Sequence, residues 1–366
     1  MAAMERSLDL GAPEGQVYAE LAYQTSQRQG MWKRRLDRAL VNEWIDRALR
    51  SAREGTPPKV RAMVAKASWQ NDLEAGLEAL RLADSLEDDG LRSAALHPVQ
   101  VAFEARGDLD EAWRHAQLRA ELLPSITDPD HVADTLMGLI DLQLNIGRIA
   151  QARAGVVTLE DTVAGLTPHH RVHGLGTRVR LHAAIGEWEA VRALTPQAEE
   201  WIELNLATPC PFNVGSMLLA ASAMTYGSDR AEADRLVAKA ESIGMVGYEE
   251  FMTPRWLLLA IAQRNQAVLR RTVDSITADS LTAGAWDLVA VWLDALSELG
   301  DRDRIEAEAP KWIRPDGYAA AFAVKALGVA RRDPGLLKEA AKRFESMGIT
   351  WHAARAREAS AHVGAG

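Results

Sequence analysis

The sequence predicts an all-α protein: a right-handed α-α superhelix (an α-solenoid) of about nine helical hairpins, followed by a C-terminal capping helix. Three observations support this fold. Apolar residues recur at helical spacing along most of the chain, runs of alternating strand-type residues are absent, and one turn pattern recurs many times. The composition, with 48% hydrophobic and 25% charged residues, is that of a globular protein with enough apolar residues for a large core.

The clearest copy of the turn is the stretch ARGDLDEAWRHA at residues 105–116. Apolar residues recur every three or four positions on both sides of it, which predicts two amphipathic helices. Gly107 can adopt the left-handed conformation that ends a helix, and Asp108 can cap the next helix, with Glu111 in capping-box position. Because the turn is so short, the two helices must form an antiparallel hairpin.

The same turn recurs along the chain at intervals of 32 to 42 residues, with a mean of about 37. Each interval accommodates two helices and two short turns. The residues that we take as turn anchors are Asn71, Gly107, Gly147, Gly186, Ser228, Arg264, Gly300 and Arg332.

In chain order, the elements form a single domain, because no linker rich in Gly, Pro or Ser divides the sequence. We expect helices near residues 15–29 and 38–53 in the first hairpin and near 350–362 at the end. The predicted segments of the domain 1–366 are a flexible N-terminal tail (1–14), an N-terminal hairpin (15–56), the repeats (57–348), and a capping helix with a tail (349–366).

The stretch GDLDEAWRHA resembles the middle of a tetratricopeptide repeat, whose turn commonly reads Gly-Asp-Tyr-Glu-x-Ala. Leu109 replaces the Tyr, and Ala112 is the matching small residue. The period is longer than the usual repeat of about 34 residues. Such long, irregular repeats resemble those in the helical arms of large bacterial ATP-dependent regulators, which include LuxR-type transcriptional activators of the maltose-activator kind and cyclase-associated signalling ATPases.

Two longer stretches are similar to parts of the same regulators. Residues 18–52 resemble the segment that follows the ATPase module, and residues 340–359 (AAKRFESMGITWHAARAREA) resemble the closing repeat. The phosphate loop Gly-x-x-x-x-Gly-Lys-Ser/Thr of the ATPase is absent from the sequence. The resemblance therefore implies either a detached arm of such a regulator or a stand-alone relative, acting as a protein-protein interaction scaffold in signalling or transcription.

The net charge limits the kinds of partner that we expect, and the cysteine content indicates the cellular compartment. The net charge is −9, and residues 61–300 alone carry −14, which would repel nucleic-acid phosphates and suit a basic partner. The single cysteine, Cys210, allows no intramolecular disulfide and fits a reducing cytoplasm, with the side chain expected to be buried. No apolar run approaches the 18 or so residues of a membrane span, so we expect no membrane contact.

The sequence shows no constellation of residues that predicts catalysis, so we expect neither an enzyme nor a cofactor. His169 and His173 are spaced as an i, i+4 pair that could bind a metal from one helix face. No His-Glu-x-x-His motif accompanies them, and no third ligand is evident nearby. The sequence therefore favours solvated or hydrogen-bonded histidines and no metal site.

A solenoid presents a concave surface, which in tetratricopeptide proteins is lined by the first helix of each hairpin. The resemblance implies which positions of these helices face the concave surface: they lie about 13, 10, 6 and 3 residues before each anchor. The candidate groove residues chosen in this way are His97, Glu104, Asp134, Asp141, His173, Arg180, Phe251, Leu258, Asp287 and Asp294.

This groove is acidic and histidine-bearing in the middle and apolar near residues 251–261. It would suit a protein or peptide of basic or mixed character with an apolar anchor. Charge reversal at Asp134 and Asp141 would then weaken partner binding and leave the protein folded. The alternative partner is a small-molecule effector. The superhelix would enclose the effector and signal its binding to an ATPase or regulator. The sequence does not predict the oligomeric state.

Overall fold

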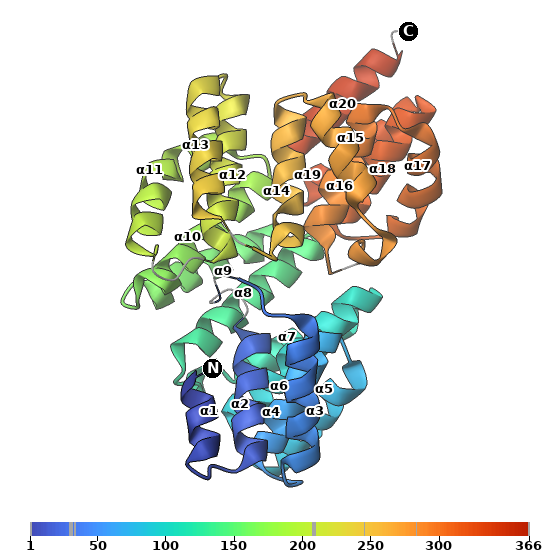
Figure 1. The fold of residues 1–366 in the computed structure, drawn as a ribbon. Helices are drawn as coiled ribbons and strands as arrows, with labels where there is room; N and C mark the ends of the chain where they lie inside the picture. Colours follow the sequence, from blue (N-terminus) through green and yellow to red (C-terminus); the bar gives the residue numbers. More distant parts are fainter. Residues whose placement is uncertain are drawn as a thin grey trace. The chain divides into compact units, whose positions relative to one another are not determined.

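The computed structural model describes residues 2–28, 32, 34–206, 210–244, 246–282 and 284–364. Over these ranges the chain forms twenty α-helices and no β-strand, and sequential helices pack as neighbours (Figure 1). The all-α repeat fold predicted from the sequence is confirmed. None of the helices in the described part of the chain is long and apolar enough to cross a membrane.

The chain divides into two compact units, unit 1 (Met1–Leu139) and unit 2 (Ile140–Gly366), where the sequence suggested a single domain. The helices of unit 1 are α1 (Ala2–Asp9), α2 (Glu14–Gln27), α3 (Arg38–Ser51), α4 (Pro57–Gln70), α5 (Leu73–Ser85), α6 (Asp89–Arg106) and α7 (Leu109–Glu121), followed by the 3₁₀ turn η2 (Leu123–Ser125). The boundary between the units falls inside α8 (Pro129–Asn145).

Unit 2 continues the pairing of helices to the end of the chain. Its elements are α9 (Ile149–Val163), α10 (Pro168–Ala184), α11 (Trp188–Leu204), α12 (Pro211–Tyr226), α13 (Arg230–Ile243), α14 (Glu249–Ala262), α15 (Gln266–Ser275), η3 (Ala278–Ser280), α16 (Trp286–Leu299), α17 (Arg302–Glu308), η4 (Ala309–Trp312), α18 (Tyr318–Arg331), α19 (Pro334–Ser346) and α20 (Thr350–Gly364). The capping helix expected near residues 350–362 is α20.

The N-terminal segment contains a short helix. Residues 1–14, expected to form a flexible tail, contain α1, and Leu8 at its C-terminal end packs against the apolar core of α2 and α3. Leu8 buries apolar surface on the first hairpin, which offsets part of the entropy lost by ordering the segment.

All eight predicted turn anchors have left-handed backbone conformations, with φ between 50° (Arg332) and 79° (Gly107). At Gly107, the next residue caps the following helix: the Asp108 carboxylate accepts a hydrogen bond from the Glu111 backbone N–H at 3.3 Å. A side chain at φ > 0 costs roughly 1 kcal/mol outside glycine, so the anchors that are not glycine show how strongly the hairpin requires this conformation. The turn therefore ends one helix and starts the next at a fixed residue.

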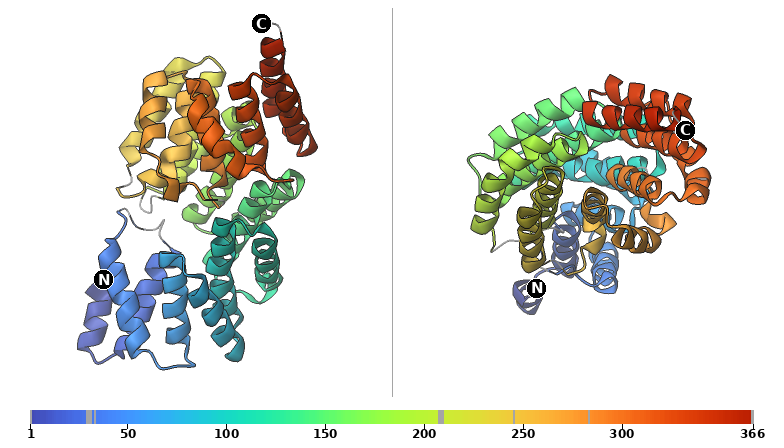
Figure 2. Two further views of the ribbon diagram at one scale, coloured as in Figure 1. Left: turned by 90° about the vertical axis from the view of Figure 1, so that its right-hand side faces the viewer. Right: turned by 90° about the horizontal axis from the view of Figure 1, so that it is seen from above.

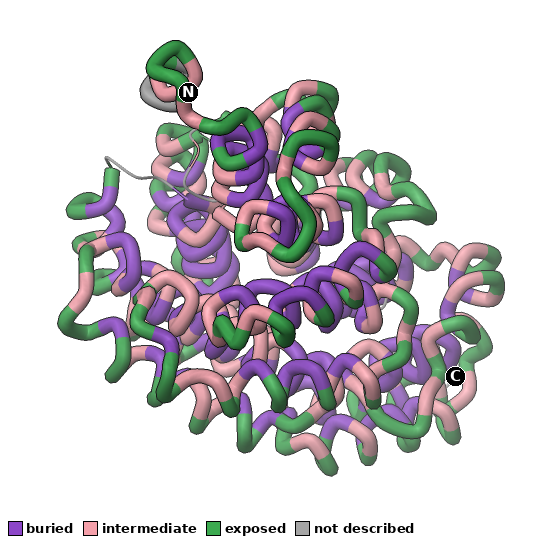
Figure 3. The backbone as a smooth tube through the Cα atoms, turned by 90° about the horizontal axis from the view of Figure 1, so that it is seen from below, coloured by how far each residue is buried: buried purple, intermediate pink, exposed green. Residues whose placement is uncertain are grey.

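Buried residues recur along the helices of both units, as the backbone coloured by burial shows (Figure 3). The fifth residue after each of the eight anchors is buried. These residues are Gly76, Ala112, Ala152, Val191, Ala233, Leu269, Ile305 and Leu337. The larger side chains in this set fill the same space between helices that alanine fills in the better copies. Packing between the two helices of each hairpin is thus preserved where the sequence motif has degenerated.

Unit 2 closes on itself, because its last helices return to its first ones (Figure 2). The Tyr318 hydroxyl donates a hydrogen bond to the Ala184 carbonyl, and the His352 Nε2 lies 3.1 Å from the same oxygen. Trp351 of α20 packs edge-on against Trp188 of α11 and Tyr226 of α12, with ring centroids 5.6 and 5.4 Å away. These contacts connect helices that are far apart in the sequence and enclose the inner side of the unit.

Gly186 provides a test of this closure. It has φ of +78°, and a Cβ added there would lie 2.5 Å from the Trp351 Cβ. Gly300 is a matched control, since it is also a turn anchor, with φ of +67°, but has no atom within 4 Å of an added Cβ. We expect Gly300→Ala to lower the free energy of unfolding by about 1 kcal/mol and Gly186→Ala by about 3 kcal/mol, measured by urea denaturation. Equal losses would contradict the packing of α20 on this turn.

Candidate functional site

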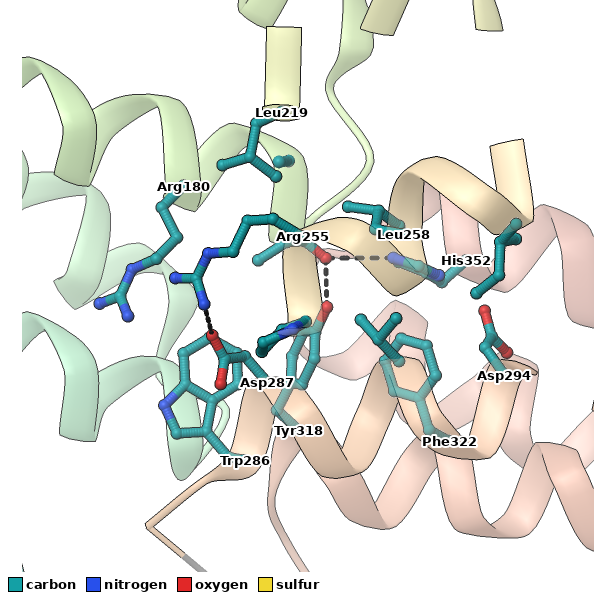
Figure 4. A pocket seen from close by; sticks show the side chains of 15 residues that line it. Arg180, Leu219, Arg255, Leu258, Trp286, Asp287, Asp294, Tyr318, Phe322 and His352 are labelled. Atoms are coloured by element: carbon teal, nitrogen blue, oxygen red, sulfur yellow. Dashed lines mark hydrogen bonds and ion pairs between the residues drawn. The ribbon is translucent and has the colours of Figure 1, made fainter. Parts of the chain in front are cut away.

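The described part of unit 2 contains a narrow cavity on its inner side (Figure 4). The first helix of each successive hairpin contributes to it, from α10 to α18, and α20 completes the wall. Its lining residues are Arg180, Ala183, Ala184, Leu219, Pro254, Arg255, Leu258, Ile261, Trp286, Asp287, Val291, Asp294, Tyr318, Phe322 and His352. The empty space between these side chains, including the open mouth, is about 530 Å³.

One end of the cavity carries two arginines, each paired with an aspartate. Arg180 donates to the Asp141 carboxylate, and the Arg255 Nη1 lies 3.0 Å from the Asp287 Oδ2. Burial lowers the pKa of Arg255, and the neighbouring Arg180 cation lowers it further, against the effect of Asp287. Burial also acts to lower the pKa of Arg180, but Asp141 and Asp287 outweigh it and raise the value. Both guanidinium groups remain charged, because an arginine pKa starts above 12.

The other end carries a buried pair and a neutral histidine. The Lys325 Nζ donates to the Asp294 Oδ1 at 2.6 Å, and both side chains are less than one-tenth exposed. Burial opposes ionisation of Asp294, but Lys325 and Arg355 hold its pKa below the usual value. Burial lowers the pKa of His352 to about 3, so its imidazole is neutral at physiological pH.

Apolar and aromatic groups separate the two polar ends. Tyr318 meets Trp286 edge-on and packs against Phe322, with centroids 5.0 Å apart in each pair. Leu258 and Ile261 from α14 face the same space. The cavity therefore has an apolar middle, and its charges are balanced in pairs.

Two buried polar atoms of the lining have no hydrogen-bonding partner among the described residues: the Nε of Arg180 and the Nδ1 of His352. The Ala184 carbonyl can only accept, so the neutral His352 donates to it from Nε2 and leaves Nδ1 as an acceptor. The Arg180 Nε is a donor. Buried polar atoms are seldom left without partners, so these two atoms are an unsatisfied donor and an unsatisfied acceptor among the side chains of the lining.

The ten candidate groove residues fall in different surroundings. Arg180, Leu258, Asp287 and Asp294 line the cavity, and Asp141 pairs with Arg180 behind it. Phe251, near the start of α14, does not line the cavity; it is 43% exposed, and its ring lies 6.1 Å from that of Tyr248. His173 lies instead beside His169 and Cys210.

The other three candidates lie in unit 1, and two of them contact a buried arginine. Arg119, only 2% exposed, has its Nη2 2.5 Å from the Asp134 Oδ2 and its Nη1 2.9 Å from the His97 Nδ1. Glu104 accepts a hydrogen bond from the Gln100 amide at 2.8 Å. Although burial favours the neutral acid, His97 and Arg119 lower the pKa of Asp134 to about 2. These side chains hold one another inside unit 1.

Several lining residues were missed from the sequence. Arg255, Trp286 and Tyr318 lie at offsets from the turn that the four inward positions do not include. Phe322 lies ten residues before Arg332, so the same rule applied to the last turn would have found it. His352 carries no such signal, because α20 is not followed by a turn anchor.

No protein-family model matches the chain, and no curated protein matches it. The function must therefore be inferred from the geometry of the cavity and from the residues around it.

Asp134 tests the role of the buried cluster in unit 1. We expect Asp134→Lys to lower the free energy of unfolding by about 2–3 kcal/mol, because it leaves the buried Arg119 without its carboxylate and adds a like charge. This replaces the expectation that charge reversal at Asp134 leaves the fold unaffected. Asp110→Lys, at an exposed position of α7, should change the same value by less than about 0.5 kcal/mol. Equal losses of the free energy of unfolding for Asp134→Lys and Asp110→Lys in urea denaturation would contradict the structural role of Asp134.

His352 predicts an acid-sensitive stability. Its pKa is about 3 in the folded protein and about 6.5 when unfolded, so protons bind preferentially to the unfolded chain between these values. The contribution of His352 is therefore fully present above pH 6.5 and is lost as the pH falls toward 3. We expect the stability difference between pH 7.5 and pH 4.5 to be about 2 kcal/mol smaller in His352→Phe than in the wild type. If the substitution leaves this difference unchanged in urea denaturation, His352 has the same pKa in the folded and unfolded states, and burial does not lower it.

Proposed function

We propose that unit 2 is a ligand-binding solenoid that takes up a small, largely apolar molecule of no net charge in its inner cavity. The observation that carries this proposal is the balance of charge at the cavity. Each aspartate of unit 2 that was predicted to line the groove is already paired with a cation of the chain itself. Asp141, Asp287 and Asp294 pair with Arg180, Arg255 and Lys325 respectively. A basic peptide would have to displace these partners, which would leave buried cations without carboxylates.

The shape of the cavity supports the same proposal. Its aromatic and aliphatic walls favour a ligand with an apolar body. The contact of α18 and α20 with Ala184 narrows the space further. A helix or an extended peptide needs a more open groove than this.

We propose in addition that the chain is an arm of a regulator. The supporting observations are the tetratricopeptide-like turns and the resemblance of residues 18–52 and 340–359 to the arms of bacterial ATP-dependent regulators. In that role, occupancy of the cavity would be reported to an ATPase or to a transcriptional partner. Since the walls come from six helices, a bound molecule would couple several hairpins at once.

A protein partner is the second candidate function. The observation that favours it is the exposed Phe251, the predicted apolar anchor, which lies outside the cavity. A partner bound through Phe251 would not need the cavity to be empty, so the two functions can be separated by experiment.

Filling the cavity tests the leading proposal. Leu258→Trp places a larger side chain into the cavity, whereas Val157→Trp changes a 58% exposed position on α9 and serves as the control. The proteins are screened with fractions of a metabolite library that contains polar and apolar compounds. We expect at least one fraction to raise the melting temperature of the wild type and of Val157→Trp but not that of Leu258→Trp. Saturation at 100 times Kd would stabilise the protein by about 2.7 kcal/mol, which a thermal shift assay resolves.

Phe251→Ser completes the comparison. If no fraction stabilises the wild type, and a protein partner is captured equally by wild type and Leu258→Trp but is lost in Phe251→Ser, the small-molecule proposal is wrong and the scaffold is favoured. The same fractions acting on Phe251→Ser as on the wild type would show that the cavity, and not the exposed aromatic, takes up the ligand.

A further inference from the structure

Three metal-ligating side chains converge in unit 2, away from the residues that line the cavity. His169 and His173 lie one turn apart on α10, and Cys210 occupies the N-cap position of α12. One potential ligand atom from each residue lies within 4.8 Å of those of the other two. The sequence offered no third ligand close to the histidine pair, and the fold supplies one from 37 residues beyond His173.

The separation of these atoms is close to that of a metal site. A tetrahedral zinc ion with bonds of about 2.0–2.1 Å to nitrogen and 2.3 Å to sulfur holds its ligand atoms roughly 3.3–3.6 Å apart. The ligand atoms, which lie within 4.8 Å of one another, therefore need to approach by about 1.5 Å at most, which rotation about the χ angles can provide. Two histidines and a thiolate form a borderline-soft set of three ligands, which leaves a fourth position open.

The surroundings favour a site that is shielded from solvent. Cys210 is fully buried and His169 is 8% exposed. The rings of His169 and His173 have centroids 4.3 Å apart, and His173 also packs on Phe212 at 4.6 Å. The packing of the imidazoles against each other and against Phe212 keeps the two rings close together, so modest rotations are enough to bring their nitrogens to a shared ion.

Cys210 has neighbours that can support a thiolate. Burial raises the pKa of its thiol to about 11, while the backbone N–H groups of Asn213 and Phe212 act in the opposite direction. The thiol Sγ lies 3.4 Å from the Asn213 Oδ1, and the Asn213 Nδ2 is buried without a hydrogen-bonding partner among the described residues. If the thiol loses its proton to a metal, the backbone N–H groups of Phe212 and Asn213 at the start of α12 can donate to the thiolate. These two donors are thus placed to orient the ligand from behind.

We propose that His169, His173 and Cys210 form a zinc-binding site that connects α10 to the start of α12. The bound ion would join the first helices of two adjacent hairpins, and the thiol proton would leave to solvent on binding. Zinc affinity should consequently decrease as the pH falls, because protons compete for the thiolate and for both imidazoles.

The test uses the full chain, stripped with a chelator and kept reduced. Titration with Zn²⁺ followed by calorimetry should show one ion bound per chain, and the melting temperature should rise with it. Titration with Co²⁺ should give the visible bands of a tetrahedral site and the near-ultraviolet charge-transfer band that only a thiolate ligand produces. Because both readouts use the wild type, the proposal does not depend on a variant that folds.

Matched variants assign the ligands. Cys210→Ser should abolish the thiolate band, and Cys210→Ser or His173→Gln should weaken Zn²⁺ binding more than about 100-fold, since loss of groups that only orient ligands already costs up to that factor. His170→Gln, at the adjacent histidine outside the cluster, should bind Zn²⁺ as the wild type does. Absence of Zn²⁺ binding by the wild type at micromolar concentrations, or an unchanged affinity in Cys210→Ser, would overturn the proposal.

Discussion

The left-handed residue at each of the eight anchor turns, from Asn71 to Arg332, is the constraint on which the structure depends. Since the chain reverses at a single residue with positive φ and the next residue begins a helix, the distance from anchor to helix is nearly constant. Residues at equal offsets from successive anchors therefore face the same side. Trp286 and Tyr318 each lie fourteen residues before an anchor, and Leu219, Arg255 and Val291 each lie nine before one. The cavity is thus built by repeating one register in hairpins whose sequences have diverged.

Local signals were sufficient to predict the helices, the turns and much of the inner register. A glycine or asparagine followed by an acidic residue specifies a turn by itself, because the left-handed conformation and the N-cap involve only adjacent residues. Four of the lining residues were selected in this way: Arg180, Leu258, Asp287 and Asp294. The same signals placed Gly186 at a turn without indicating that its missing side chain makes room for Trp351.

What sequence reasoning could not provide depends on contacts between distant segments. The carboxylates of the inner register looked available to a basic partner, since their cations lie on other helices: Arg180 and Arg255 on α10 and α14, and Lys325 on α18. The approach of Cys210 to the histidine pair and the contact of His352 with Ala184 are equally non-local. No periodic pattern encodes such pairings, because they follow from the curvature that all the hairpins produce together.

The return of α18 and α20 to Ala184 has a consequence for how unit 2 folds. In an open array of repeats each hairpin touches only its neighbours, so the ends fray independently and folding can start anywhere. Here one hydrogen bond joins residues that are 134 positions apart in the sequence, and a second joins residues that are 168 positions apart. Such contacts form only after the intervening hairpins are in place, which raises the contact order and slows the last step of folding. Once formed, they tie the two ends together, so the hairpins between them open and close as one cooperative body.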